Sequence, residues 1–233
     1  MKCLVFDIWG DYGHFRKFYT TSSPLTFSIP PRTTVCGIIA ALIGLDKEEY
    51  LKYFTKDKCN IAIQLNKEVN KTRLSYNLIN TKTAKLYSQI KDRTQVTFEL
   101  LQDPSYRIYI NHLDNEIYSK IKSYLEANKN YYTLSMGLSQ FIAEFRYVKE
   151  IDLEYKDNSN EFVYINTAIA FDEDMEIQFE EGKEYFKDTM PNEMNEDRVV
   201  QEYKKVLFER NGLPISCKCN YYSGNEGEKL VFL

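Results

Sequence analysis

Several patterns are missing from this sequence, and each absence excludes a class of protein. The five cysteines form no Cys-x-x-Cys pair, so we expect neither a disulfide framework nor a zinc site. Cys217 and Cys219 lie two residues apart, but two thiols alone do not make a metal site. No apolar run approaches the roughly 18 to 20 residues of a membrane span, and we do not expect the amino-terminal MKCLVFDIWG to be a signal peptide. We therefore expect a cytoplasmic protein without membrane contact.

Catalytic signatures are missing as well. The motifs Gly-x-Ser-x-Gly, Walker A, His-Glu-x-x-His and Gly-x-Gly-x-x-Gly do not occur. His14 and His112 are the two histidines, and neither has a recognised catalytic spacing to Asp, Cys or Ser. Acidic pairs such as Asp172 and Asp174 are more typical of a solvated face than of a metal site. We expect no catalytic residue, no metal and no cofactor.

The composition is that of a globular protein, with an uneven distribution of charge. The 233 residues are 43% hydrophobic and 27% charged, with a net charge of −4. Residues 1–100 hold 15 Lys or Arg and 9 Asp or Glu, a net charge of +6, whereas the remainder holds 15 and 25, a net charge of −10. A basic half and an acidic half indicate different partners, with a polyanion on the basic half.

The stretch SSPLTFSIPPRTTVCGIIAALIGL, residues 22–45, predicts a buried helix that starts beside polar residues. Its apolar residues have helical spacing: Val35, Ile38, Ile39, Leu42 and Ile43. Thr33 or Thr34 is the predicted N-cap, and Gly44 is the predicted end. Arg32 and the threonines either only cap this helix or also hold a phosphate, because helix starts attract anions.

Two further segments in the basic half suit nucleic acid. YGHFRKFY, residues 12–19, interleaves aromatic and basic side chains, on which RNA bases stack while the cations hold phosphates. A structured loop with its aromatics packed on the core is the alternative. Residues 70–95 form either a hairpin arm or a disordered linker, and their cations are Lys71, Arg73, Lys82, Lys85, Lys91 and Arg93.

The order of predicted elements is strand, helix, strand, strand, helix, strand. The ranges besides the helix above are strands 2–9, 60–66, 105–110 and 141–148 and helix 114–129, with strand composition also at 72–80 and 95–101. This order predicts an α+β fold with a ferredoxin-like βαββαβ unit and an enlarged central hairpin. We assign it to residues 1–150 and a mainly β extension to 151–233, with a hairpin at Asn211-Gly212.

The segments FDIWGDYGHFR and TTSSPLTFSIPPRTTVCGIIAALIG resemble the CRISPR-associated Cas5 family, whose members are subunits of type I (Cascade) interference complexes. YTLSMGLSQFIAEF, residues 132–145, and VLFERNGLPI resemble its type I-B branch. The resemblance covers nearly the whole chain. It implies a ferredoxin-like RAMP domain, a β-hairpin thumb at about residues 70–95 and a C-terminal β extension.

The resemblance further implies a non-catalytic, RNA-binding subunit in antiviral defence. Such a subunit caps the 5′ handle of crRNA, contacts the Cas7-type backbone subunit and the Cas8-type large subunit, and meets target DNA only indirectly. The implied phosphate contacts are Arg16, Lys17, Arg32, Thr33 and Thr34. The implied base contacts are Tyr12, His14 and Phe15, and Ser139 and Gln140 lie in a loop near the handle. The implied thumb residues are Lys82, Lys85, Tyr87, Lys91 and Arg93.

Two alternatives stay open. One branch of the family cleaves repeat RNA without a metal by means of Tyr, Lys and His. Here His14 or His112 would act as acid or base beside a Tyr or Lys, although Asn111-His112 stands where a Lys-His pair is expected. The other alternative is a protein–protein adaptor without RNA contact.

Overall fold

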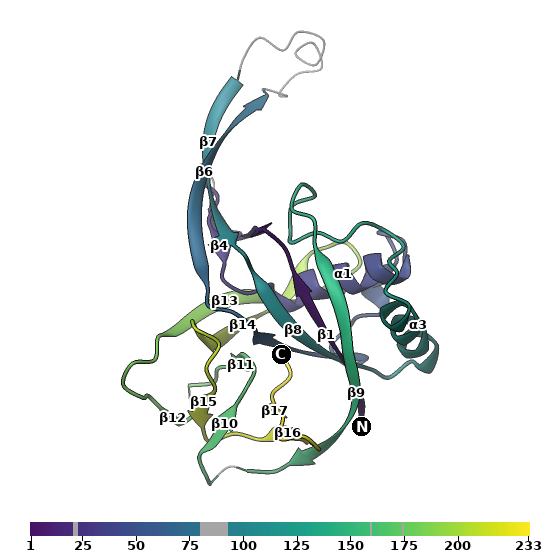
Figure 1. Cartoon of the computed structure of the whole chain (residues 1–233), viewed down its shortest axis with the longest axis vertical. Coiled ribbons are helices and arrows are strands. Elements are labelled where there is room, and N and C mark those ends of the chain that lie inside the picture. The colour runs from purple at the N-terminus through teal and green to yellow at the C-terminus, as the bar shows by residue number, and fades with distance from the viewer. Residues whose placement is uncertain (21–22, 80–92, 159, 174) are drawn as a thin grey trace.

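A central antiparallel sheet organises the molecule. The computed structural model describes residues 1–20, 23–79, 93–158, 160–173 and 175–233 (Figure 1). The sheet has six strands in the order β17-β16-β9-β1-β8-β5. Its four longer strands are β1 (Lys2–Trp9), β5 (Cys59–Leu65), β8 (Ser105–His112) and β9 (Glu144–Lys156). β1 lies between β8 and β9, so it is buried along almost its whole length.

Two helices, α1 (Arg32–Ile43) and α3 (Asn115–Glu126), lie together on one side of this sheet (Figure 1). The even-numbered residues of β1 share their hydrophobic core, because alternate residues of a strand point to opposite faces. Cys3 and Val5 belong to a separate cluster with Ile151 and Leu153. Asp114 caps α3 as predicted, and its carboxylate accepts from two backbone N–H groups. Each strand and helix predicted for residues 1–150 is present, but the strand predicted at 141–148 begins at Glu144 and continues to Lys156.

The start of α1 differs from the prediction. The N-cap is Pro31, whose extended backbone carries no side-chain cap, and Arg32 is already helical. The prediction of a threonine N-cap is therefore wrong by two or three positions. At the other end Gly44 adopts the left-handed conformation with φ 72°, and its N–H donates to the carbonyl of Ala40, as a glycine end requires.

The 70–95 segment contains a long hairpin that projects from the body (Figure 1). β6 (Asn70–Ile79) and β7 (Arg93–Gln102) pair antiparallel over their full lengths. The hairpin alternative is thus confirmed for the described residues. Four predicted thumb residues lie outside the described residues: Lys82, Lys85, Tyr87 and Lys91.

The C-terminal half is built from short strands and one long pair. Two three-stranded sheets form, in the orders β10-β15-β12 and β11-β14-β13. The strands are β10 (Val163–Ile165), β11 (Ile169–Ala170), β12 (Ile177–Gln178), β13 (Tyr185–Met194), β14 (Val200–Glu209) and β15 (Ile215–Cys217). β16 (Tyr221–Gly224) and β17 (Lys229–Leu230) then extend the central sheet. β9 crosses residue 150, where the sequence predicts a boundary.

The predicted hairpin at Asn211-Gly212 is wrong. β14 pairs with β13 and β11, whereas β15 pairs with β10 and β12, so the two strands that flank the turn belong to different sheets. The buried carboxylate of Glu209 accepts from the backbone N–H groups of Asn211 and Leu213. These bonds satisfy the turn without strand pairing, and they direct the chain into the second sheet.

Candidate nucleic-acid interface

The structure brings three predicted segments together. β2 (Tyr12–Gly13) and β3 (Phe15–Arg16) run past the loop of residues 133–143, where the N–H of His14 donates to the carbonyl of Met136 at 2.9 Å. Gly137 (φ +96°) lies so close that an added Cβ would come within 2.0 Å of the His14 carbonyl oxygen. The same loop faces the start of α1.

A pocket of about 320 Å³ opens between this loop and α1. Its lining comes from α1, from the short helix that follows it, from the loop, and from the end of β13 and the turn after it: Thr33, Thr34, Gly37, Ile38, Ala41, Tyr50, Thr133, Leu134, Ser135, Gly137, Met194 and Arg198. These residues supply several hydroxyl groups and one guanidinium, and none of them is Asp or Glu. Burial raises the pKa of Tyr50, which starts the short 3-10 helix Tyr50–Lys52, so its phenol keeps its proton. We call this site the α1 pocket.

Arg198 is a residue that the sequence analysis missed. It has a left-handed backbone with φ 62°, and its Nη2 donates to the carbonyl of Lys47 at 3.0 Å. Its guanidinium carbon lies 5.8 Å from the ring centre of Tyr50. Arg198 follows Glu196 and Asp197 in the acidic half, so no pattern in the sequence connected it with α1.

Arg32 does not take part in this pocket. Its side chain is buried, and it donates to the carbonyls of Phe54, Cys59 and Asn192 at 3.1, 2.6 and 3.2 Å. This corrects the prediction that Arg32 grips a phosphate. The guanidinium turns inward because three backbone carbonyls from distant parts of the chain accept its N–H groups there.

His14 and Phe15 are buried too, which corrects their prediction as base contacts. The Nδ1 of His14 lies 2.8 Å from the carbonyl of Glu99, and its ring packs edge-on against Phe98. Phe15 packs against Tyr106. The alternative that these aromatics pack on the core is confirmed for both residues.

Other predicted residues stay at the surface. Arg16, Ser139 and Gln140 are exposed, Thr34 is half-buried, and Tyr12 packs against Phe141. Lys17 is half-buried, and its Nζ forms an ion pair with Asp188 at 2.6 Å. The aromatic rings of this segment that are most exposed belong to Phe18 and Tyr19, at 54% and 58% exposure. Neither residue was among the predicted base contacts.

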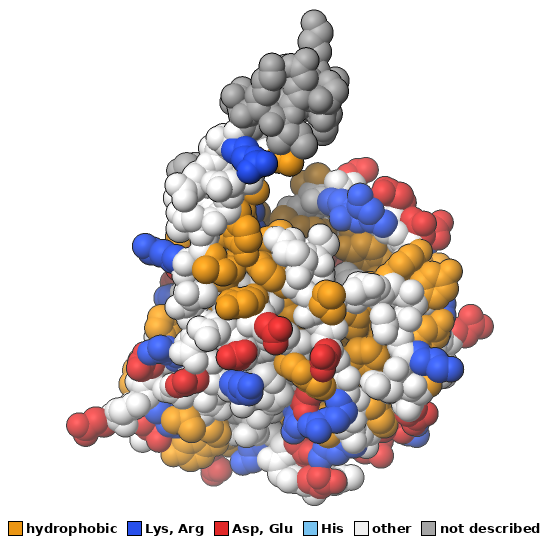
Figure 2. All heavy atoms as spheres, turned by 45° about the horizontal axis from the view of Figure 1, so that its top comes forward, with side chains coloured by type: hydrophobic (Ala, Val, Ile, Leu, Met, Phe, Trp, Pro, Cys, Tyr) orange, Lys and Arg blue, Asp and Glu red, His pale blue; other side chains and the backbone are white. Residues whose placement is uncertain are grey.

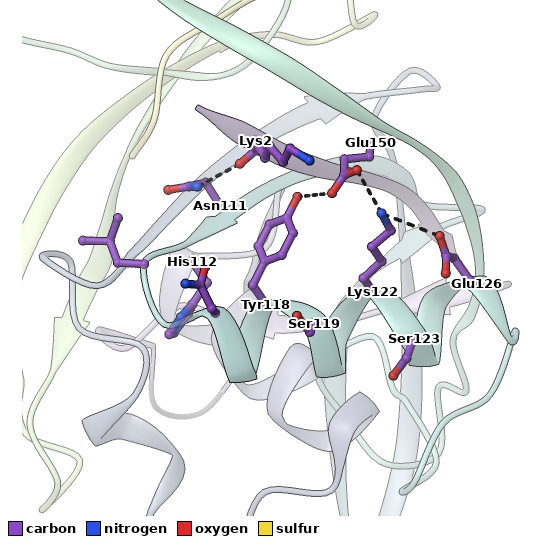
Figure 3. A pocket seen from close by; sticks show the side chains of 11 residues that line it. Lys2, Asn111, His112, Tyr118, Ser119, Lys122, Ser123, Glu126 and Glu150 are labelled. Carbon is purple, nitrogen blue, oxygen red and sulfur yellow. Dashed lines mark hydrogen bonds and ion pairs between the residues drawn. The ribbon is translucent and has the colours of Figure 1, made fainter.

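A second pocket of about 580 Å³ lies beside α3 (Figure 3). Glu150 accepts from the hydroxyl of Tyr118 and from the Nζ of Lys122, both at 2.9 Å. His112 also lines this pocket but is 3% exposed, and both of its ring nitrogens are engaged. Nε2 lies 2.8 Å from the carbonyl of Tyr53, and Nδ1 accepts from the N–H of Asp114.

The described residues hold no metal-site candidate. No group of three or more His, Cys, Asp or Glu side chains gathers among them. Within the same residues, no helix has the length and apolar character needed to cross a membrane.

One comparison with known proteins identifies a family. The sequence profile of a CRISPR-associated protein family, Cas5, matches residues 3–204. Comparison with curated protein sequences gives no match. A CRISPR protein from Archaeoglobus fulgidus has a similar structure, with a TM-score of 0.62 and 16% identity over 100% of this chain and 99% of that chain.

Two similar structures come from larger assemblies. One, from a CRISPR RNA-guided surveillance complex, has a TM-score of 0.55 and 10% identity over 91% of both chains. The other, from the Type III-B Cmr-beta complex bound to cognate target RNA and AMPPnP, has a TM-score of 0.51 and 13% identity over 93% of this chain and 86% of that chain. At these identities the similarity concerns the fold alone.

Proposed function

The chain belongs to the CRISPR-associated Cas5 family, and from this premise we propose that it is a non-catalytic subunit of a type I interference (Cascade) complex that caps the 5′ handle of crRNA. In that role it serves antiviral defence as a structural and RNA-binding component. The main support for this proposal is the α1 pocket. The start of α1 and the loop of residues 133–143 both line it, and the segment that contains His14 packs against that loop.

The chemistry of the α1 pocket suits a sugar–phosphate backbone. Thr33, Thr34 and Ser135 offer hydroxyl groups, and Arg198 offers a guanidinium that binds phosphate strongly. The backbone at the start of α1 adds a favourable dipole for an anion. Since no carboxylate lines the pocket, nothing there repels a phosphate.

The strand order supports the prediction of a ferredoxin-like domain of the RAMP type. The strands β9-β1-β8-β5 lie in this order and pair antiparallel, with α1 and α3 together on one side. That is the arrangement that a βαββαβ unit produces. The hairpin of β6 and β7 leaves this unit between β5 and β8, which is where the family's thumb is expected.

The hairpin has two chemically different faces. Its even-numbered residues carry no charge and include Leu74, Tyr76, Leu78, Val96 and Phe98. Its odd-numbered residues include Lys71, Arg73 and Arg93 against Glu99. Figure 2 shows hydrophobic side chains gathered at the base of the projecting hairpin. The charged face suits RNA phosphates, and the uncharged face suits a protein neighbour.

We assign that neighbour to the backbone subunit and a further surface to the large subunit, with target DNA met only indirectly. The family match supports a place in a CRISPR-associated assembly, and chains of the same fold occur in a CRISPR RNA-guided surveillance complex and in Cmr-beta.

The test is purification of the tagged chain co-expressed with the proteins of its genomic neighbours, followed by sequencing of the bound RNA. We expect short RNAs with one fixed 5′ end. Arg198→Glu should lower handle-RNA retention about tenfold or more, because it removes a charge-assisted contact and adds a like charge. Lys120→Glu, an equal charge change on the exposed side of α3, is the matched control.

Two outcomes contradict the proposal. Equal RNA retention by wild type and Arg198→Glu would show that the α1 pocket is not the handle site. A complex that forms without RNA would favour the adaptor alternative.

A metal-independent endoribonuclease is the second candidate, because His112, Tyr118 and Lys122 line one pocket (Figure 3). The contacts of these side chains weaken it. Both nitrogens of His112 are engaged, and burial and the bond to Glu150 raise the pKa of Tyr118. Cleavage of repeat RNA in EDTA, lost in His112→Ala, would establish the nuclease and overturn the non-catalytic proposal.

A further inference from the structure

Two thiols meet at the carboxyl end of β15. Cys217 is the last residue of this strand, the central one of its sheet, and it pairs with Val163 of β10 and Ile177 of β12. Cys219 follows two residues later, and the two Sγ atoms lie 3.5 Å apart. The chain then enters β16 and the central sheet.

Lys218, between the two cysteines, is held on the other side of the chain. Its N–H donates to the carbonyl of Glu176 at 2.9 Å, and its Nζ pairs with the carboxylate of Glu176 at 2.7 Å. The same Nζ lies 5.0 Å from the ring centre of Phe162. Because alternate residues of an extended chain point to opposite sides, these contacts keep both thiols on one side.

Only one of the two thiols is accessible. Cys217 is fully buried and Cys219 is half-buried, whereas Cys3, Cys36 and Cys59 are all buried. Burial raises the pKa of Cys36 to about 11 and also raises the pKa of Cys3 and Cys59, so these three stay as thiols. The hydrogen bond from Cys217 lowers the pKa of Cys219, which favours the nucleophilic thiolate there.

We propose that Cys217 and Cys219 form a dithiol site that reduces hydrogen peroxide and closes to an intrachain disulfide. The Cys219 thiolate attacks one peroxide oxygen, the O–O bond breaks, and the leaving hydroxide takes a proton to form water. Cys219 is then a sulfenic acid. The Cys217 thiol attacks its sulfur, the S–O bond breaks, and the hydroxide leaves with the Cys217 proton as a second water. Two thiols are oxidised and one peroxide is reduced.

The geometry requires little movement for the second step. A disulfide has an S–S distance of about 2.05 Å, so the sulfurs approach by roughly 1.5 Å. Cys217 is already in contact with Cys219, so no loop has to open for the buried thiol to resolve the sulfenic acid. A dithiol reductant restores the pair by thiol–disulfide exchange at the accessible Cys219.

The test uses the purified full-length chain, hydrogen peroxide at equimolar concentration, intact mass spectrometry and peptide mapping. We expect a loss of about 2 Da, one peptide that carries a Cys217–Cys219 bond, and full reversal by dithiothreitol. Cys219→Ser should show no loss of mass. Cys217→Ser should stop at the sulfenic acid, trapped by dimedone on Cys219. Cys36→Ser should behave as wild type.

Three results would overturn the site. They are a sulfinic acid or an intermolecular disulfide at Cys219 in the wild type, the same loss of mass in Cys219→Ser, or no oxidation of either thiol. Cys219 is half-buried, so its serine variant remains informative even if Cys217→Ser, in the buried position, does not fold.

Discussion

Arg32 carries a positive charge into the interior of the protein. Three carbonyl oxygens accept from its guanidinium, while its Nε has no hydrogen-bond partner among the described residues. The three carbonyls belong to Phe54, Cys59 and Asn192, which lie before β5, at its start and in β13. Arg32 therefore ties the start of α1 to both halves of the chain.

We expect Arg32→Ala to lower the free energy of unfolding by about 2 to 4 kcal/mol, because it leaves buried carbonyls without donors. Urea unfolding followed by circular dichroism measures the change. Arg32→Lys should also destabilise, since one ammonium cannot span three carbonyls. Arg16→Ala, at an exposed position, should change stability by less than about 0.5 kcal/mol. A stable Arg32→Ala variant that lost RNA binding would restore the phosphate role.

His14 predicts a dependence of stability on pH. Burial lowers the pKa of His14 from its usual value of 6.5, and the positive charge of nearby Arg16 lowers it further. As the pH falls, His14 therefore takes up a proton in the unfolded chain at a higher pH than in the folded chain. The contribution of neutral His14 to the free energy of unfolding is therefore complete above about pH 6.5. It is lost as the pH falls toward the lower pKa of His14 in the folded state. In His14→Gln, melting temperatures between about pH 7 and 5 should fall less than in the wild type. Equal slopes would contradict the account.

At the scale of elements, the loop of residues 133–143 depends on Gly137. An added Cβ would meet the His14 carbonyl oxygen at 2.0 Å, and φ is +96°. Gly182 has a similar φ of +83° but nothing within 4 Å of an added Cβ. Comparing the two positions therefore separates the cost of the backbone conformation from the cost of the collision.

We expect Gly182→Ala to cost about 1 kcal/mol of stability, which is the price of the positive φ alone. Gly137→Ala should cost at least about 2 kcal/mol more, because the loop must leave β2 and β3 to remove the collision. It should also reduce handle-RNA retention, since Gly137 lines the α1 pocket. Thermal unfolding and the RNA pull-down measure the two effects. Similar costs at the two positions would mean that the loop does not need its contact with His14.

Some helices and turns could be predicted from the sequence and others could not. The apolar stripe of α1 and its Gly44 end were predictable because helical spacing and a left-handed glycine are local signals. The threonine N-cap failed because Pro31 takes that position without a side-chain bond. The Asn211-Gly212 hairpin failed because Glu209, a residue with no local signal for this role, satisfies the turn. β13 was missed because YFKDTMPNEM contains Pro and no clean alternation.

The candidate site was predictable by segment rather than by residue. The sequence indicated residues 12–17, 32–34 and 139–140. In the structure His14 bonds to the loop of residues 133–143, and the same loop shares a pocket with Thr33 and Thr34. It also turns Arg32, His14 and Phe15 inward, because burial depends on neighbours distant in sequence. Arg198 could not be found from the sequence, since its place beside Tyr50 exists only after folding.

For the whole molecule, the charge split along the sequence is not a split in space. Lys17 pairs with Asp188 at 2.6 Å, and Lys56 lies 3.4 Å from Glu202, so cations of the basic half meet carboxylates of the acidic half. Met190, Val206 and Phe208 join the core formed by α1 and the central sheet. The pocket cation itself, Arg198, comes from the acidic half. Local charge around the pocket and hairpin therefore matters more than the net charge of either half.

The two faces of the hairpin give a prediction for the assembled complex. Each phosphate contact to single-stranded nucleic acid contributes about 0.7 to the slope of log K against log salt. We expect Arg73→Gln with Arg93→Gln to reduce that slope by about 1.4, because both residues lie on the charged face. Leu74→Ala with Leu78→Ala, on the uncharged face, should leave the slope unchanged and weaken retention of the backbone subunit instead.

Binding of labelled crRNA at about 50 to 300 mM KCl measures the slope, and the subunit ratio after gel filtration measures retention. The two double variants serve as controls for one another, because both change the same hairpin on opposite faces. A lower slope in the leucine variant, or an unchanged slope in the arginine variant, would show that RNA does not lie on the charged face. If only the arginine variant lost the backbone subunit, the protein contact would lie on the charged face of the hairpin. The uncharged face would then not make the interaction that we assign to it.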